Sequence, residues 1–244
     1  MVTKPRTTKA KVTRVPRRRR LVRGMARGLA RGLLGLVGLY AALILAFAVV
    51  PPPGNLYQWS ESRRLGGLER DWVAWDEMAP VLARSVVAAE DANFCLHWGF
   101  DIAAIREAVA AGGNRGASTI SQQVTKNVFL WHGRSYIRKA AEAVLTPAVE
   151  LVWSKRRILE VYLNIAEFDE GVFGVQAAAR HYFGVDARDL SPMHAARLAA
   201  VLPDPKGRSV SSPSDFVRQR TRAIMAGADT IAADGRAGCF GPAG

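Results

Sequence analysis

An uncharged apolar segment of 18 residues, from Leu33 to Val50, restricts the fold of this chain more than any other feature. As a helix it spans about 27 Å, close to the roughly 30 Å hydrocarbon core of a bilayer. The prolines at 51–53 stop a helix at this point. The segment therefore predicts a single transmembrane anchor. A signal peptide cleaved after Ala48 and a buried core helix are the alternatives.

The net charge of +13 is concentrated in front of this segment. Residues 1–32 hold 12 Lys or Arg and no acidic residue, so the rest of the 244-residue chain carries a net charge of +1. This distribution excludes a uniformly basic nucleic-acid-binding domain. Positive residues beside a membrane span remain on the cytoplasmic side, so we expect residues 1–32 inside and 51–244 outside. The basic tail also favours anionic lipid headgroups.

The remainder of the chain predicts one mainly α domain. We divide the chain into a basic cytoplasmic tail (1–32), a transmembrane helix (33–50), a connector (51–75), a globular domain (76–226) and a loose C-terminal tail (227–244). Trp59, Trp72 and Trp75 of the connector suit either a membrane interface or the core. Capping residues predict helices that open at Asp76, Asp101, Ser118, Ser135, Ser191 and Asp215, with another short helix within 171–184. Pro147 is expected to kink or split the helix that follows Ser135.

The cysteine and histidine content excludes several kinds of site. Two cysteines, Cys95 and Cys239, cannot form a disulfide framework or a Cys-rich zinc site, although one pair remains open. The four histidines show no H-x-x-x-H spacing, so no structural metal is expected.

Two polar patterns lie on predicted helices. Thr119, Gln122, Gln123 and Lys126 fall on one side of the helix after Ser118, opposite Ile120, Val124 and Val128. This side suits sugar and phosphate, but a solvated helix face has the same pattern. Arg134, Arg138 and Glu142 follow at intervals of four, with Lys139 beside them. Residues 115–157 carry a net charge of +6, which suits a polyanion or a surface salt-bridge stripe.

A pair of carboxylates, Glu90 and Asp91, ends the apolar run VVAA. A carboxylate at an apolar helix end is a candidate for a raised pKa and for base chemistry. A solvated helix end is the alternative. Phe94 and His97 follow closely and are expected to support the loop.

Six segments resemble the motifs of family 51 glycosyltransferases, the peptidoglycan polymerases. EDANFCLHWGFD (90–101) is similar to E-D-x-x-F-x-x-H-x-G, and GASTISQQVTKN (116–127) is similar to G-x-S-T-[IL]-[ST]-Q-Q-x-x-K-N. RKAAE (138–142), SKRRILEVYLN (154–164), FGVQAAARHYFG (173–184) and SPMHAARLAAVLPDP (191–205) follow in the family's order. With one membrane helix and no following transpeptidase-sized domain, the chain resembles the monofunctional biosynthetic transglycosylases.

The resemblance implies a lysozyme-like, mainly α glycosyltransferase domain behind one transmembrane helix. It implies polymerisation of lipid II into β-1,4-linked glycan with release of undecaprenyl pyrophosphate. A small mobile subdomain would lie around 109–133, with Val128, Phe129, Leu130 and Trp131 as a membrane-touching edge or as core. A muramidase or lytic transglycosylase is the alternative enzyme, and a membrane adaptor is the alternative without catalysis.

The resemblance also implies roles for individual residues. Glu90 matches the general base and Glu142 the second essential carboxylate. Lys126, Arg134, Arg138 and Lys139 match positions that contact pyrophosphate. Asp91, Phe94, His97, Gly99, Ser118, Thr119, Gln122, Gln123 and Asn127 would bind sugar or shape the site. Glu142 would either orient the basic side chains or hold a divalent cation, Mg²⁺ or Mn²⁺, and no other cofactor is expected.

The expected partners are lipid II, the growing glycan chain and the membrane, but not nucleic acid. Components of the cell-division or elongation machinery are a further option. The expected location is the bacterial cytoplasmic (inner) membrane, crossed once, with the N-terminus inside and the catalytic domain on the periplasmic face.

Overall fold

The computed structural model describes residues 17–112, 116–133 and 135–241. These residues belong to two compact units, one ending at Leu43 and the other beginning at Ile44. The helices are α1 (Arg17–Phe47), α2 (Leu56–Leu65), α3 (Pro80–Glu90), α4 (Ile102–Ala110), α5 (Ile120–Phe129), α6 (Tyr136–Val152), α7 (Lys155–Ile165), α8 (Val175–Phe183), α9 (Pro192–Val201) and α10 (Asp215–Ala233). Short 3₁₀ helices lie at Trp75–Glu77 and Ala187–Asp189. The strands are β1 (Glu69–Arg70), β2 (Glu167–Asp169) and β3 (Val172–Phe173).

The predicted apolar helix is confirmed. Within α1, the 26 residues Val22–Phe47 are long and apolar enough to cross a membrane. The helix ends at Phe47 rather than at Val50. Its last turn, Ile44–Phe47, belongs to the second unit, and there the Trp153 indole donates to the Ile44 carbonyl at 2.7 Å. The Arg157 guanidinium donates to the carbonyls of Phe47 at 3.1 Å and Val50 at 2.8 Å. The bond to Phe47 thus satisfies a carbonyl that the end of α1 leaves without a helical partner.

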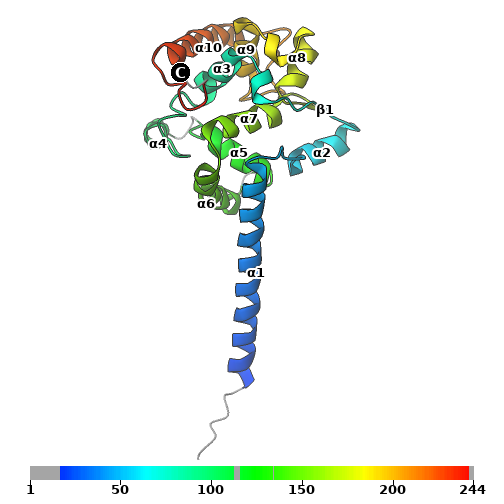
Figure 1. Ribbon diagram of the computed structural model, residues 1–244, viewed down its shortest axis with the longest axis vertical. Coiled ribbons are helices and arrows are strands. Elements are labelled where there is room, and N and C mark those ends of the chain that lie inside the picture. The colour runs from blue at the N-terminus through cyan, green and yellow to red at the C-terminus, as the bar shows by residue number, and fades with distance from the viewer. Residues whose placement is uncertain (1–16, 113–115, 134, 242–244) are drawn as a thin grey trace, which may run out of the picture. The chain divides into compact units, whose positions relative to one another are not determined.

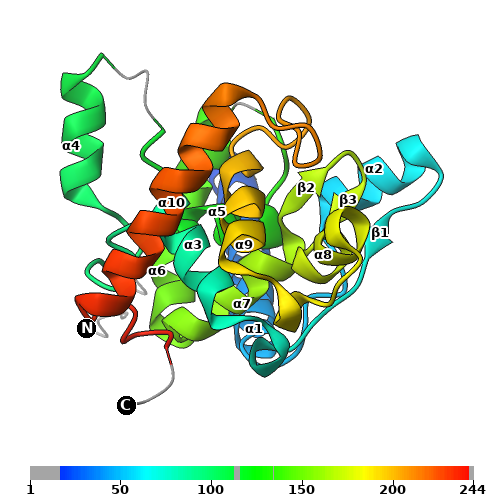
Figure 2. The same ribbon diagram turned by 90° about the horizontal axis from the view of Figure 1, so that it is seen from above.

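The mainly α prediction is confirmed, and the second unit has a helical core (Figures 1 and 2). α10 packs against α3 and α9, and α3 also packs against α9. α5 packs against α6 and α7. The strands form one small sheet in the order β1-β3-β2, with β1 parallel and β2 antiparallel to β3. In Figure 2, α4 stands at the edge of this core, and Ala108 is its only buried residue.

Several predicted helix starts are confirmed by their caps. Asp101 accepts from the Ala104 amide at 2.9 Å, Ser135 from Arg138 at 3.4 Å and Ser191 from His194 at 3.2 Å. The helix predicted within 171–184 is α8.

Three predicted caps are wrong. Asp76 lies in a 3₁₀ helix and caps nothing, because α3 begins later with Pro80 in its first turn. The cap of α5 is Thr119 instead of Ser118, and the cap of α10 is Ser214 instead of Asp215. Pro147 lies inside α6, so the helix is not split at this residue. The break comes at Trp153–Ser154, where the Ser154 hydroxyl accepts from the Arg157 amide at 3.1 Å and starts α7.

The expectation of a loose tail from residue 227 is also wrong. α10 continues to Ala233, and the segment beyond it is attached to the body. Cys239 forms a disulfide with Cys95, which settles the pairing that the sequence left open. Phe240 is 2% exposed, with its ring 6.3 Å from Phe94 and 6.4 Å from Trp75. Residues 242–244 lie outside the described part of the chain.

The connector is folded rather than extended. It contains α2 and β1, and Asn55 caps α2 by accepting from the Gln58 amide at 2.8 Å. Trp59 is 58% exposed and carries the Arg63 guanidinium over its ring, whereas Trp75 packs on Phe240. The structure thus separates the solvent-facing Trp59 from Trp75, which is half-buried against Phe240, and Trp72 is also half-buried.

Candidate active site

Glu90 is the last residue of α3, and its side chain is 12% exposed. Its Oε2 accepts a hydrogen bond from Gln123 Nε2 at 3.1 Å, and Arg220 Nη2 lies 4.0 Å from its Oε1. Burial raises the pKa of Glu90 and outweighs the hydrogen bond from Gln123 and the Arg220 charge, which act in the opposite direction. The direction agrees with the one expected from the sequence, and such a carboxylate is suited to accept a proton from a hydroxyl.

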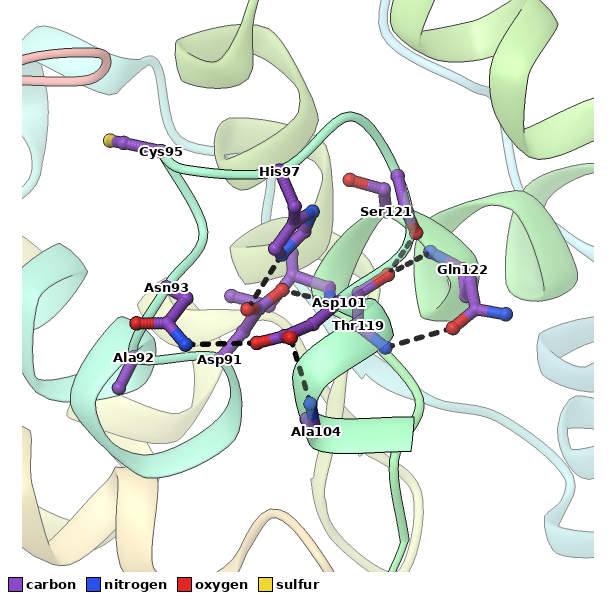
Figure 3. A network of polar contacts seen from close by, with 12 residues as sticks. Asp91, Ala92, Asn93, Cys95, His97, Asp101, Ala104, Thr119, Ser121 and Gln122 are labelled. Carbon is purple, nitrogen blue, oxygen red and sulfur yellow. Dashed lines mark hydrogen bonds and ion pairs between the residues drawn. The ribbon is translucent and has the colours of Figure 1, made fainter. Parts of the chain in front are cut away.

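Asp91 is buried and fixes the loop that follows Glu90 (Figure 3). Its Oδ1 lies 2.9 Å from His97 Nε2, and its Oδ2 accepts from the Ile120 amide at 3.0 Å. The carboxylate thus faces the N-terminus of α5, where the helix dipole favours negative charge. Both oxygens have partners, so Asp91 holds the loop and Glu90 is the less constrained carboxylate. His97 supports the loop as predicted.

The loop closes on α5 and α6 through Gly99. Gly99 has a φ of +84°, and a Cβ there would lie 2.8 Å from Thr146 Cγ2. Its carbonyl accepts from Thr119 Oγ1 at 2.7 Å. The ring of Phe94, which is fully buried, lies inside the same loop. Only a glycine fits this close approach without strain.

The polar side of α5 is mostly buried, so the solvated-face alternative is wrong. Thr119 and Gln122 form a capping box, with bonds of 3.2 Å from the Gln122 amide and 3.1 Å to the Gln122 side chain. Gln122 Nε2 also donates to Glu142 Oε1 at 3.4 Å. The next residue, Gln123, contacts Glu90. Neighbouring amides on α5 therefore reach the two predicted carboxylates.

Glu142 is buried on α6 and neutralised by two cations. Its Oε2 accepts from Arg138 Nη1 at 2.8 Å, and its Oε1 accepts from Lys139 Nζ. Burial lowers the pKa of Lys126, and the charges of Arg138 and Lys139 lower it further, against the opposing charge of Glu142. Within the described residues, the Lys126 ammonium has no hydrogen bond or ion pair. An anion is the partner that such a cation lacks.

Arg134 lies outside the described residues, so the structure does not test its place in the stripe. Because α6 begins at Tyr136, the helical stripe of the described residues runs from Arg138 to Glu142. Ser118 is exposed, and Asn127 is half-buried.

The residues at Glu142 do not fit a divalent cation. Both oxygens already accept from Arg138 and Lys139, and these cations would repel a metal ion. The described residues also contain no cluster of three metal-ligating side chains. The geometry favours the first role left open for Glu142, the orientation of basic side chains.

A second buried carboxylate on α6, Glu150, was missed by the sequence analysis. It accepts from Ser121 Oγ and, at 2.7 Å, from Lys155 Nζ. Lys155 also lies 4.4 Å from the centre of the Phe94 ring. Glu150 follows Glu142 by eight residues, about 80° further round α6, so both fall within one broad side of the helix, which is the signal that could have identified it.

Two further residues near Glu90 were also missed. Tyr162 of α7 donates to Gln123 Oε1 at 3.4 Å and so orients the amide that contacts Glu90. Arg220 of α10 donates to the Ala89 carbonyl at 3.1 Å beside Glu90. Arg220 is 130 residues from Glu90 in the sequence, and no local pattern marks it.

The four residues expected at a membrane-touching edge divide between core and surface. Phe129 and Leu130 are buried, with Phe129 packed on Phe47 and Trp153. Val128 is half-buried, and Trp131 is 42% exposed. The core alternative therefore holds for the two central residues.

Comparison with known proteins gives consistent matches. Residues 59–229 match the family model described as Transglycosylase. The chain is 60% identical over 226 residues to a protein named biosynthetic peptidoglycan transglycosylase from Jannaschia sp. (strain CCS1), covering 93% of this chain and 95% of that protein. A protein of the same name from Pseudomonas fluorescens (strain Pf0-1) is 50% identical over 199 residues, with 77% and 82% covered. Neither the family match nor these names support the lytic alternative.

Proposed function

Because the chain belongs to the transglycosylase family of peptidoglycan glycosyltransferases, we propose that Glu90 and the cations on α5 and α6 share the work of glycan polymerisation. The chain is a glycosyltransferase that extends glycan for cell-wall synthesis. In the proposed reaction, the 4-hydroxyl of lipid II attacks the anomeric carbon of a growing chain. The bond from that carbon to undecaprenyl pyrophosphate breaks, and the hydroxyl proton passes to a carboxylate.

The observation that carries this proposal is the state of Glu90. It is a carboxylate at the end of a buried helix, its pKa is raised by burial, and one of its oxygens is oriented by Gln123. The orientation of Gln123 depends in turn on Tyr162. A base of this kind takes the hydroxyl proton as the new bond forms.

The leaving group requires neutralisation rather than protonation, because pyrophosphate is a weak base. Lys126 is a desolvated cation with no ion pair among the described residues, and Arg138 and Lys139 of α6 lie close enough to repel its charge. A pyrophosphate bound here would accept hydrogen bonds from preorganised cations in a partly desolvated site. Binding of this anion would also restore the charged form of Lys126 that burial disfavours.

The C-terminal end of α1 supports a membrane anchor that is retained over a signal peptide that is cleaved. Cleavage after Ala48 would remove Ile44 and Phe47, which contact Trp153 and Phe129 of the body. It would also leave the indole of Trp153, a residue that is 3% exposed, without its carbonyl partner. These contacts favour an enzyme that stays attached to the membrane that holds its substrate.

Orientation and membrane contact have further support. Disulfides persist in oxidising compartments, so the Cys95–Cys239 bond favours a body outside the cytoplasm, as the basic tail does. Ile137, Val144 and Leu151 lie along one face of α6 and are 76%, 74% and 73% exposed. An apolar stripe of this kind suits the lipid surface.

The test is polymerisation of labelled lipid II by the full-length protein in detergent. The product should be a glycan polymer that muramidase digests. Glu90→Gln should lower the rate by at least about a hundredfold, since it removes the base while keeping the shape of the side chain. The matched control is Glu77→Gln, which changes an exposed carboxylate paired with Arg188 and should leave the rate unchanged.

Two results would contradict the proposal. Absence of polymer from the folded parent protein would remove the activity itself. Polymer formed by Glu90→Gln at a rate similar to that of the control would assign the base to another residue.

A further inference from the structure

The segment after α10, residues 234–241, bends back onto the loop that follows Glu90; we call it the C-terminal hook. It contacts this loop at three points. Arg236 Nη1 donates to the Ala92 carbonyl at 3.2 Å, and Cys239 is joined covalently to Cys95. The Phe240 ring lies 6.3 Å from that of Phe94. The hook is therefore joined to Ala92 by a hydrogen bond, to Cys95 by a covalent bond and to Phe94 by a ring contact.

The same loop carries the groups that orient the site. Asp91 precedes the three contacted residues, and His97 follows them. Asp91 bonds His97 (Figure 3). It also accepts from the amide of Ile120, which begins α5, the helix that bears Gln123 and Lys126. In Figure 3, the Cys95 side chain points away from the Asp91 carboxylate, so the hook holds the loop from its outer side.

The hook is positioned by α10, which also reaches Glu90. Gly227 of α10 lies against α3 so closely that an added Cβ would be 3.1 Å from Ala88 Cβ. Arg220 of the same helix bonds the Ala89 carbonyl and lies 4.0 Å from Glu90. One helix thus touches the proposed base directly and the loop after it through the hook.

We propose that the C-terminal hook is a positioning element of the transfer reaction, and that full activity requires the Cys95–Cys239 disulfide. The inference rests on the proposed role of Glu90 as the base. The hook touches no reacting atom, so it acts through the Asp91 loop. Loss of the covalent link would let this loop move, which lowers the fraction of molecules with aligned groups and thus affects kcat more than KM.

The disulfide makes this positioning dependent on oxidation. Two thiols, Cys95 and Cys239, lose two electrons and two protons as the sulfur–sulfur bond forms. A disulfide of an external thiol oxidant accepts them and becomes two thiols. A chain synthesised with reduced cysteines would therefore gain full activity only after it reaches an oxidising compartment.

The experiment compares four forms of the full-length protein in lipid II turnover. They are the oxidised parent, the parent treated with dithiothreitol, the Cys95→Ser/Cys239→Ser double variant, and Phe168→Leu. The chain has two cysteines, so the reductant acts on this bond alone. Phe168 is a fully buried residue of β2, outside the hook and the loop that follows Glu90. Its substitution by leucine serves as a control that lowers the stability of the core without changing the hook.

We expect kcat to fall about tenfold in the reduced parent and in the double variant, with KM changed less than about twofold. Oxidised glutathione should restore the reduced parent and leave the double variant unchanged. Phe168→Leu should lower the Tm while keeping kcat. Either of two results would refute the inference. One is a double variant that retains the kcat of the parent. The other is a Phe168→Leu variant that loses as much Tm and as much kcat as the double variant does.

Amide hydrogen exchange gives a readout that does not depend on activity. Residues 91–99 should exchange faster in the reduced parent and in the double variant, whereas β2 and β3 should not. Unchanged exchange at 91–99 would overturn the inference even if polymerisation is observed. Faster exchange in a protein that makes no polymer would instead place the failure in the proposed function.

Discussion

Glu142→Gln tests whether the buried ion pairs of α6 hold the site together. Glu142 is 2% exposed and accepts from Arg138, Lys139 and Gln122. The substitution keeps the shape of the side chain but removes its charge. It also replaces one acceptor oxygen with an amide donor, which must then face another donor.

The expected loss in the free energy of unfolding follows from how exposed each partner of Glu142 is. Removal of one member of a buried pair costs about 3–5 kcal/mol. The Lys139 side chain is 48% exposed and can turn to water, whereas that of Arg138 is 13% exposed and remains largely enclosed. The substitution therefore leaves one buried cation, Arg138, without its partner, and we expect the free energy of unfolding to fall by about 3 kcal/mol. For a body of this size, that lowers the Tm by about 6–12 °C.

The assay is thermal unfolding followed by circular dichroism at one scan rate. Arg138→Gln in the Glu142→Gln background removes the stranded guanidinium, so the double variant should regain part of the lost Tm. Glu77→Gln breaks an exposed pair with Arg188 and should cost less than about 1 kcal/mol. The reasoning fails if Glu142→Gln unfolds within about 2 °C of the parent, or if its loss and that of Arg138→Gln simply add.

Three other perturbations have expected outcomes. Because burial raises the pKa of Glu90, the ionised carboxylate destabilises the folded protein at neutral pH. Glu90→Gln should therefore have a higher Tm than the parent at neutral pH. This difference in Tm should disappear as the pH falls below 4.5, the ordinary pKa of a glutamate. A lower Tm at neutral pH would contradict this. Because its pKa is lowered, Lys126 loses its charge at a less alkaline pH than the ordinary lysine pKa of 10.5. In the parent, the KM for lipid II should therefore rise in the alkaline range below pH 10.5. In Lys126→Arg, whose guanidinium stays charged, the KM should remain constant over that range. Gly99→Ala and Gly66→Ala both place alanine at a positive φ, +84° and +78°, but only Gly99 has a neighbouring atom in the way, Thr146 Cγ2. Urea unfolding should show a loss of about 1–3 kcal/mol for Gly99→Ala and a smaller one for Gly66→Ala; equal losses would argue against the clash.

Local sequence rules succeeded where a structure depends on residues within one or two helical turns. The apolar run before Pro51 predicted α1, and the caps at Asp101, Ser135 and Ser191 predicted helix starts. A cap is an interaction over three residues, so neighbouring side chains suffice to specify it.

The errors at two caps came from adjacent capping residues. Ser118-Thr119 and Ser214-Asp215 each offer two candidates at consecutive positions. For α5 the sequence held enough information, because Gln122 lies three residues after Thr119 and completes a capping box. For α10, Ser214 accepts from the Val217 amide at 3.3 Å and leaves Asp215 in the first turn.

Burial of the polar side of α5 depends on contacts that are distant along the chain. A helical wheel shows that Gln122 and Gln123 share a side, but not whether that side meets water or other helices. α6 covers Gln122 through Glu142, and the end of α3 meets Gln123 through Glu90. The same packing converts a surface-type pattern of charges into buried pairs, and it sets the pKa of Glu90.

The amino-acid order was thus sufficient for the apolar helix α1, for the caps at Asp101, Ser135 and Ser191, and, through motifs in a fixed order, for the family. It was not sufficient for the pairing of Cys95 with Cys239, 144 residues apart, or for the approach of Arg220 to Glu90. Both depend on α10 packing against α3, which brings the end of the chain to the loop after the base. Periodicity and capping act over a few residues, whereas such contacts arise only when the apolar faces of distant helices are buried together.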